Sequence, residues 1–154
     1  MGSSTTPRAR TAATAAYYAA FVGLGLTSAA LGASLPRLAA NTGSSTAQIS
    51  FLFTASAVGY MIGSTQIGRW YDRRSGHPLI AGALAILVAL MAIVPLVRLL
   101  WLLILVYLTV GIAQGVLDVG GNTLLVWTHG AKIGPYMNGL HLFFGIGAFI
   151  CPVI

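Results

Sequence analysis

Five long apolar stretches, separated by short polar turns, constrain this chain more than any other feature of its sequence. We predict a helix over each of them, at residues 15–35, 47–67, 78–97, 99–127 and 135–154. Each stretch has roughly 20 residues, which is the length that an α-helix needs to cross the hydrocarbon layer of a bilayer. None shows the alternation of apolar and polar residues that marks a membrane β-strand. The sequence therefore predicts an all-α integral membrane protein with five transmembrane helices.

The charge content excludes other classes of protein. Only 6% of the residues are charged and 57% are hydrophobic, whereas a soluble domain has roughly 25% charged residues. The net charge of +6 is not gathered in a basic run with interleaved aromatic residues, so we expect no nucleic-acid partner. The single cysteine, Cys151, excludes an intrachain disulfide, and we interpret it as a small apolar residue.

The chain is predicted to begin with a short tail. Residues 1–14 are small and polar apart from two arginines, so we expect a disordered cytoplasmic tail before a membrane bundle at residues 15–154. A signal peptide is the alternative for the first apolar stretch, because ALGAS at 30–34 resembles a cleavage site. The first stretch is longer than the apolar region of a signal peptide usually is, and four more apolar stretches follow it. We expect Pro36 and Arg37 to end the first helix.

The basic residues predict an orientation in an inner or plasma membrane. With the N-terminus in the cytoplasm, only Arg37 and Arg98 face outward. Six basic residues then face the cytoplasm: Arg8, Arg10, Arg69, Arg73, Arg74 and Lys132. The opposite orientation reverses this ratio, so the positive-inside rule favours a cytoplasmic N-terminus.

Two glycines in the second stretch predict close helix packing. Gly59 and Gly63 lie one turn apart, and small residues at this spacing let two helix backbones approach each other. Ser56, Tyr60 and Ser64 lie on much the same face.

Polar residues interrupt the fourth stretch. Asp118 is one of only two acidic residues in the chain, and an ionised carboxylate inside a membrane costs several kcal/mol, roughly, unless it is paired, protonated or hydrated. At 3.6 residues per turn one face of this helix carries Gly111, Gln114, Gly115, Asp118 and Asn122. We expect this face to meet protein or a cavity.

The fifth stretch has a polar face at a similar depth. Asn138 and His141 lie near its start, and a short loop joins it to the fourth helix. We therefore predict a polar cluster that binds a small solute, formed by Gln114, Asp118, Asn122, Asn138 and His141. The alternative is that these groups only link helices by hydrogen bonds. One histidine and one aspartate are too few for a metal site, and with no activated nucleophile we expect neither an enzyme nor a cofactor.

The loop GRWYDRRSG at 68–76 resembles the signature loop of the major facilitator superfamily. The resemblance implies that Gly68 permits close packing and that Asp72 and Arg73 make gating contacts. The second glycine of the motif, Gly76, comes one residue late, and His77 stands in place of a cation.

Two further segments narrow the resemblance. LDVGGNTLL at 117–125 and MNGLHLFFGIGA at 137–148 are similar to the fucose–galactose–glucose proton symporter branch, which includes fucose permease. The resemblance implies that Asp118 takes part in proton coupling and sugar binding. Members of that branch have a second acid in the first helix, where this chain has Gly32.

The resemblance also implies an architecture of twelve helices in two halves, each half built from two inverted three-helix repeats. The five predicted helices would form most of the N-terminal six-helix bundle, and a C-terminal half or a second subunit would supply the rest. The expected function is secondary-active transport of a sugar or similar polar solute by alternating access, with proton coupling. The alternative is a non-transporting membrane scaffold whose glycine-rich helices associate.

Overall fold

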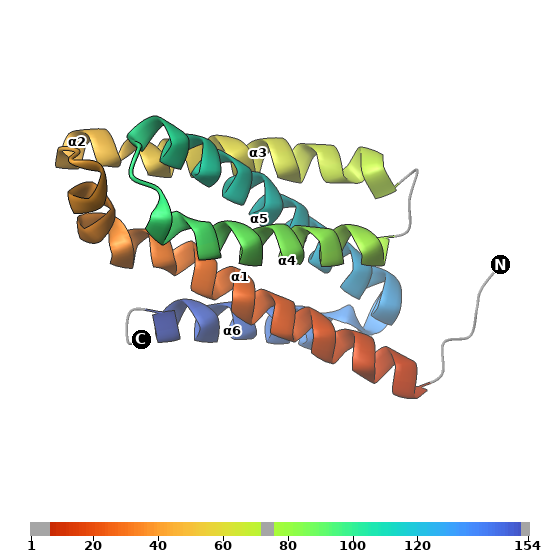
Figure 1. Ribbon diagram of the computed structural model, residues 1–154. Coiled ribbons are helices and arrows are strands. Elements are labelled where there is room, and N and C mark those ends of the chain that lie inside the picture. Colours follow the sequence, from red (N-terminus) through yellow and green to blue (C-terminus); the bar gives the residue numbers. More distant parts are fainter. Residues whose placement is uncertain (1–6, 72–75, 152–154) are drawn as a thin grey trace.

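The computed structural model describes residues 7–71 and 76–151, and within them every regular element is helical (Figure 1). Five helices have 18 or more residues. The elements are α1 (Pro7–Thr42), α2 (Thr46–Ile49), α3 (Phe51–Tyr71), α4 (Gly76–Ile93), η1 (Val94–Leu96), α5 (Leu100–His129), η2 (Gly130–Lys132) and α6 (Ile133–Ile150).

The ends of the helices follow local chemistry. Gly43 adopts a positive φ of 63° after α1, a conformation that residues with a side chain rarely adopt. Ser45 then forms a capping box with Gln48 at the start of α2, which satisfies two backbone N–H groups. Pro95 lies in the short η1 turn that follows α4. Gly130, with a φ of 53°, ends α5 before the chain reverses into α6.

Two predictions about the first helix are wrong. Helix α1 passes through Pro36 and ends at Thr42, because a membrane helix tolerates the one backbone hydrogen bond that proline removes. At its other end α1 already begins at Pro7, so residues 7–14 are helical where we expected a tail. The reason is tertiary: Thr14 is buried, and its hydroxyl lies 2.8 Å from Nε2 of His129 at the end of α5.

The long helices pack in two main pairs, α3 on α5 and α1 on α6, with α4 against α5 (Figure 1). Suppose that α1, α3 and α4 form one repeat and that α5 and α6 begin an inverted copy of it. Helix α1 then corresponds to α5 and α3 corresponds to α6, so the pair α3–α5 corresponds to the pair α6–α1. This pairing is what an inverted repeat produces. It also places α1, α3, α5 and α6 around a common centre that α4 does not line.

Glycines hold both pairs together. A Cβ atom at Gly59 or Gly63 of α3 would collide with backbone atoms of α5, and one at Gly111 or Gly115 would collide with α3. The predicted close packing of Gly59 and Gly63 is therefore confirmed. In the other pair Gly25 of α1 and Gly147 of α6 meet the opposing backbone in the same way.

The hydropathy of the helices differs from the expectation of five equal spans. Three stretches of the described residues are long and apolar enough to cross a membrane: Pro7–Thr42, Gly76–Leu96 and Leu100–Ile150. The last joins α5 and α6, between which the chain reverses. Helix α3 has 21 residues but a lower mean hydropathy than α4, because Ser56, Tyr60 and Ser64 interrupt its apolar sequence.

Candidate functional site

A cavity of about 230 Å³ lies at the centre of the four helices α1, α3, α5 and α6. Its wall combines polar groups with apolar rings and aliphatic side chains: Phe21, Leu24, Ser28, Tyr60, Gln114, Asp118, His141 and Phe144. Because each of the four helices contributes at least one residue, a relative movement of the two helix pairs would change the shape of the cavity.

The carboxylate of Asp118 is held from two sides. The Tyr60 hydroxyl of α3 donates to Oδ2, and Nδ2 of Asn122 donates to Oδ1 at 2.9 Å. The same amide also donates to the backbone carbonyl of Asp118 at 2.8 Å. Hydrogen bonds to both oxygens offset part of the cost of removing a carboxylate from water. Asp118 is nevertheless only partly buried and still borders the cavity.

Gln114 connects α5 to α1. Its side-chain amide donates to the Thr27 hydroxyl at 3.2 Å and to the Ser28 hydroxyl at 3.4 Å. The Gln114 side chain is nearly buried, with 7% of its surface exposed. This contact is therefore both a wall of the cavity and a polar link between two helices.

A second cavity, of about 440 Å³, borders the first. The two share three lining residues, Ser28, Tyr60 and Gln114. Binding pockets for small molecules usually measure about 300–1,000 Å³. The smaller cavity alone suits an ion or a small part of a solute, whereas the larger one has the volume of a complete small-molecule site.

The structure brings most of the predicted cluster together. Gln114, Asp118 and His141 line the same cavity, and Asn122 bonds directly to Asp118. Asn138 is exposed on α6 and is not among the residues lining this cavity. Among the described residues no three histidine, cysteine, aspartate or glutamate side chains come together as metal ligands would.

Sequence reasoning missed two polar contributors, Tyr60 and Ser28, and the apolar part of the wall. Tyr60 was recognised only as a member of the polar face of its helix. The signal that could have identified it is its position next to Gly59, since Gly59 and Gly63 bring α3 against the α5 backbone at Leu108 and Ile112, on the helix that carries Asp118. Ser28 lies in an alanine- and glycine-rich stretch of α1 with no local pattern that marks a site.

Two residues of the predicted gating loop, Asp72 and Arg73, lie outside the described residues. Gly68 is exposed near the end of α3, and a Cβ atom there would meet open space. Within this chain Gly68 therefore does not provide close packing. Gly76 is buried where α4 begins.

Long apolar helices around a polar cavity with a carboxylate are typical of multi-pass membrane transport proteins. Comparison with known proteins identifies the family: residues 3–154, nearly the whole chain, match the Major Facilitator Superfamily. The chain belongs to this superfamily, and it is a multi-pass membrane protein.

The relatives include sugar transporters. The chain is 37% identical over 136 residues to "Sodium-dependent glucose transporter 1" of Danio rerio, covering 88% of this chain and 23% of the relative. The human protein of that name is 33% identical, covering 88% of this chain and 26% of the relative. "Major facilitator superfamily domain-containing protein 4B" of Danio rerio is 30% identical over 92% of this chain and 26% of its own length.

The chain thus spans about a quarter of the length of these curated relatives. No solved structure gave a significant match.

Proposed function

We propose that this chain is the first part of a sugar transporter that works by alternating access, with five membrane crossings in α1, α3, α4, α5 and α6. The observation that carries the proposal is the cavity that Gln114 and Asp118 of α5 line together with His141 of α6. Donors and acceptors in the wall of this cavity and of the adjoining cavity of about 440 Å³ suit the hydroxyl groups of a sugar, and the Phe21 and Phe144 rings suit its apolar face. Glucose is named in the relatives.

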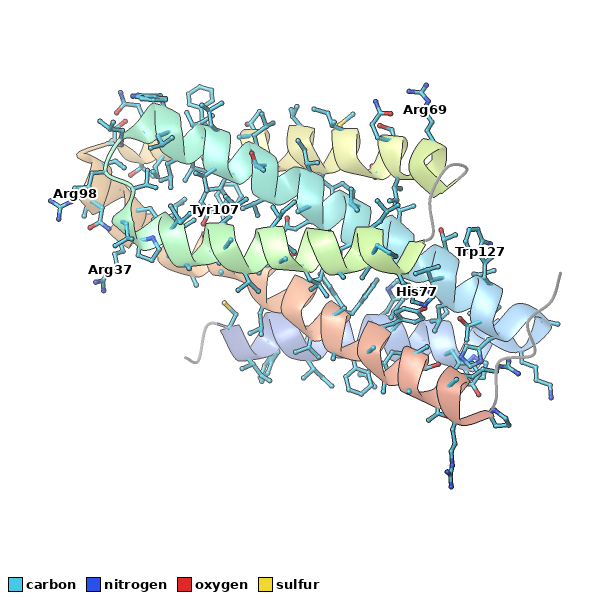
Figure 2. The ribbon with its side chains drawn as sticks, turned by 45° about the vertical axis from the view of Figure 1, so that its right-hand side comes forward. Arg37, Arg69, His77, Arg98, Tyr107 and Trp127 are labelled. Carbon is cyan, nitrogen blue, oxygen red and sulfur yellow. The ribbon has the colours of Figure 1, made fainter. Side chains whose placement is uncertain are left out.

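The arrangement of charges supports a cytoplasmic N-terminus. Arg37 and Arg98 lie at one end of the bundle and Arg69 lies at the other (Figure 2). Arg8, Arg10 and Lys132 belong to the N-terminal end of α1 and the turn before α6. A cytoplasmic location of the more basic end satisfies the positive-inside rule. Asp72 and Arg73 would then make gating contacts there with the remaining part of the transporter or with a second subunit.

Asp118 is the proposed site of the coupling ion. The resemblance to the fucose–galactose–glucose branch favours a proton, whereas the names of the relatives favour sodium. Both ions can be held by a carboxylate. Because Gly32 replaces the second acid of that branch, we propose that the ion binds at Asp118 without a second carboxylate across the cavity.

Uptake by the complete protein tests the proposal. The protein is reconstituted into vesicles, and entry of radiolabelled D-glucose and L-glucose is measured under a sodium gradient, a pH gradient or neither. Accumulation of D-glucose alone supports sugar transport, and the gradient that drives it identifies the ion. Equal entry of both enantiomers, or no entry, contradicts the proposal.

The variant Tyr60→Phe should strengthen binding of the coupling ion while the protein still folds. It keeps the ring and removes only the hydroxyl that donates to Asp118. This hydrogen bond stabilises the carboxylate before the ion binds, so without it the ion concentration for half-maximal uptake should fall roughly 10- to 100-fold.

The matched control is Tyr17→Phe, which removes a hydroxyl that lies 2.9 Å from Nε2 of His77, in α4. Its ion dependence should equal that of the unsubstituted protein. An unchanged ion dependence in Tyr60→Phe would show that this hydrogen bond does not shape the ion site.

A further inference from the structure

A cavity of about 510 Å³ lies outside the proposed sugar site, between the first turns of α1 and the turn from α5 to α6. The surrounding residues come from both ends of the chain and are mostly polar, cationic or aromatic: Pro7, Arg10, Thr11, Thr14, Ala15, Tyr18, His129, Lys132 and Tyr136. The sugar site and this cavity have no lining residue in common. A function for the second cavity therefore needs its own explanation.

The charge in this cavity is of one sign. Arg10 and Lys132 carry fixed positive charges, and none of the nine lining residues is acidic. Burial and the charge of Arg10 lower the pKa of His129, so its ring is not counted as a third charge. The chain has only two acids. Of these, Asp118 lies 11 residues before His129 on the same helix, roughly 16 Å away. That is far beyond the roughly 4 Å of an ion pair, so Asp118 forms no salt bridge in this cavity.

The wall of the cavity is fixed by contacts between helices. Thr14 donates its hydroxyl proton to the Arg10 carbonyl at 2.9 Å, so His129 is the donor in its 2.8 Å contact with Thr14 through Nε2. The other side of the His129 ring stacks on Tyr136, with ring centres 3.5 Å apart. The Tyr18 hydroxyl donates to the Tyr136 carbonyl at 3.0 Å. The cavity is thus held open by α1, α5 and α6 together.

This environment suits a compact anion with several acceptor oxygens. The Arg10 guanidinium can donate two parallel hydrogen bonds, and Lys132 adds a compact charge. Two long helices also begin at the cavity, α1 at Pro7 and α6 directly after Lys132, and helix N-termini favour negative groups. We propose that this cavity binds a phosphate group between Arg10 and Lys132.

The phosphate has two possible sources. The cavity lies at the end of the bundle where α1 begins, so the headgroup of an anionic phospholipid could reach it from the membrane surface. A soluble phosphorylated compound could reach it from the aqueous side. Both use the same chemistry. The proposal is independent of sugar transport, because the two cavities are lined by different residues.

Thermal unfolding of the complete protein in an uncharged detergent tests the site. The probes are dioctanoylphosphatidylglycerol, dioctanoylglycerol without phosphate, and glycerol 3-phosphate without acyl chains. The test variant is Arg10→Gln with Lys132→Gln, and the matched control is Arg8→Gln, an exposed neighbour that does not line the cavity. A cation near a membrane surface strengthens anion binding roughly fivefold, so the double variant should bind roughly 25-fold more weakly.

Stabilisation by phosphatidylglycerol alone supports a lipid headgroup, and stabilisation by glycerol 3-phosphate as well supports a soluble source. In either case the effect must weaken in the double variant and persist in Arg8→Gln. If the double variant does not fold, the two single variants, each expected to bind roughly fivefold more weakly, provide the same test. Equal stabilisation by dioctanoylglycerol, no stabilisation by any probe, or an equal loss in Arg8→Gln overturns the proposal.

Discussion

The variant Gly111→Val should fail to form a stable bundle, whereas Gly82→Val should fold like the unsubstituted protein. Even a single Cβ atom at Gly111 would collide with the Ser56 carbonyl and the Tyr60 backbone nitrogen of α3. Both partners are helix backbone, so neither can move aside as a flexible side chain could. Overpacking of a close-packed core costs about 1–3 kcal/mol, and valine adds two further methyl groups at this contact.

The same substitution should also disturb the cavity. Tyr60 lies at the Gly111 and Gly115 contact and donates to Asp118, so separating α3 from α5 withdraws this donor. The measurement is thermal unfolding of the complete protein in detergent, together with its size-exclusion profile. Gly82 lies exposed on α4, and a Cβ atom there meets open space. Equal stability of the two variants would contradict the backbone contact.

Helix existence could be predicted from this sequence because apolar length is a local property. Each predicted span lies for most of its described length on one long helix. Contacts between residues that are distant in the sequence were harder to predict. The helical start at Pro7 depends on Thr14 meeting His129, 115 positions away, and a polar, alanine-rich segment carries no sign of such a partner. The reach of α1 beyond Pro36 was missed because a proline rule for soluble helices was applied to a membrane helix.

The polar stripe of α5 shows how far a helical-wheel argument reaches. It correctly placed Gly111, Gln114, Gly115, Asp118 and Asn122 on one face, but it could not say what that face meets. In the structure the stripe divides: Gly111 and Gly115 pack on α3, and Gln114 turns toward α1. Two neighbouring helices, α3 and α1, each contact a different part of the stripe, and this cannot be deduced from one helix.

The position of Asn138 depends on how α6 is rotated about its axis. Asn138 shares a face of α6 with His141 in a helical-wheel projection, so both were predicted to line the site. The rotation of α6 is instead set by Gly147, which packs on the α1 backbone, and by Gly139, which is covered by the Tyr18 ring. With that rotation both side chains are exposed, but His141 borders the cavity and Asn138 does not line it.

Asp118→Asn should abolish ion-driven accumulation of sugar and leave folding intact. The amide has the same shape as the carboxylate, and its oxygen can still accept a hydrogen bond from Tyr60 or Asn122. It carries no charge and does not titrate, so neither a proton nor sodium is bound as before. Exchange of labelled for unlabelled sugar at equilibrium needs no net ion movement and should continue.

Comparing ion-driven accumulation with equilibrium exchange distinguishes a loss of ion coupling from a general loss of transport. A matched control is His141→Gln, which changes another polar group of the same cavity but retains the carboxylate; it should keep accumulation while altering sugar affinity. Undiminished accumulation in Asp118→Asn would exclude Asp118 as the ion site. Loss of both accumulation and exchange from a folded variant would instead show that Asp118 contacts the sugar itself. Because Gly32 offers no second carboxylate across the cavity, no other acid of the described residues could take over the coupling role.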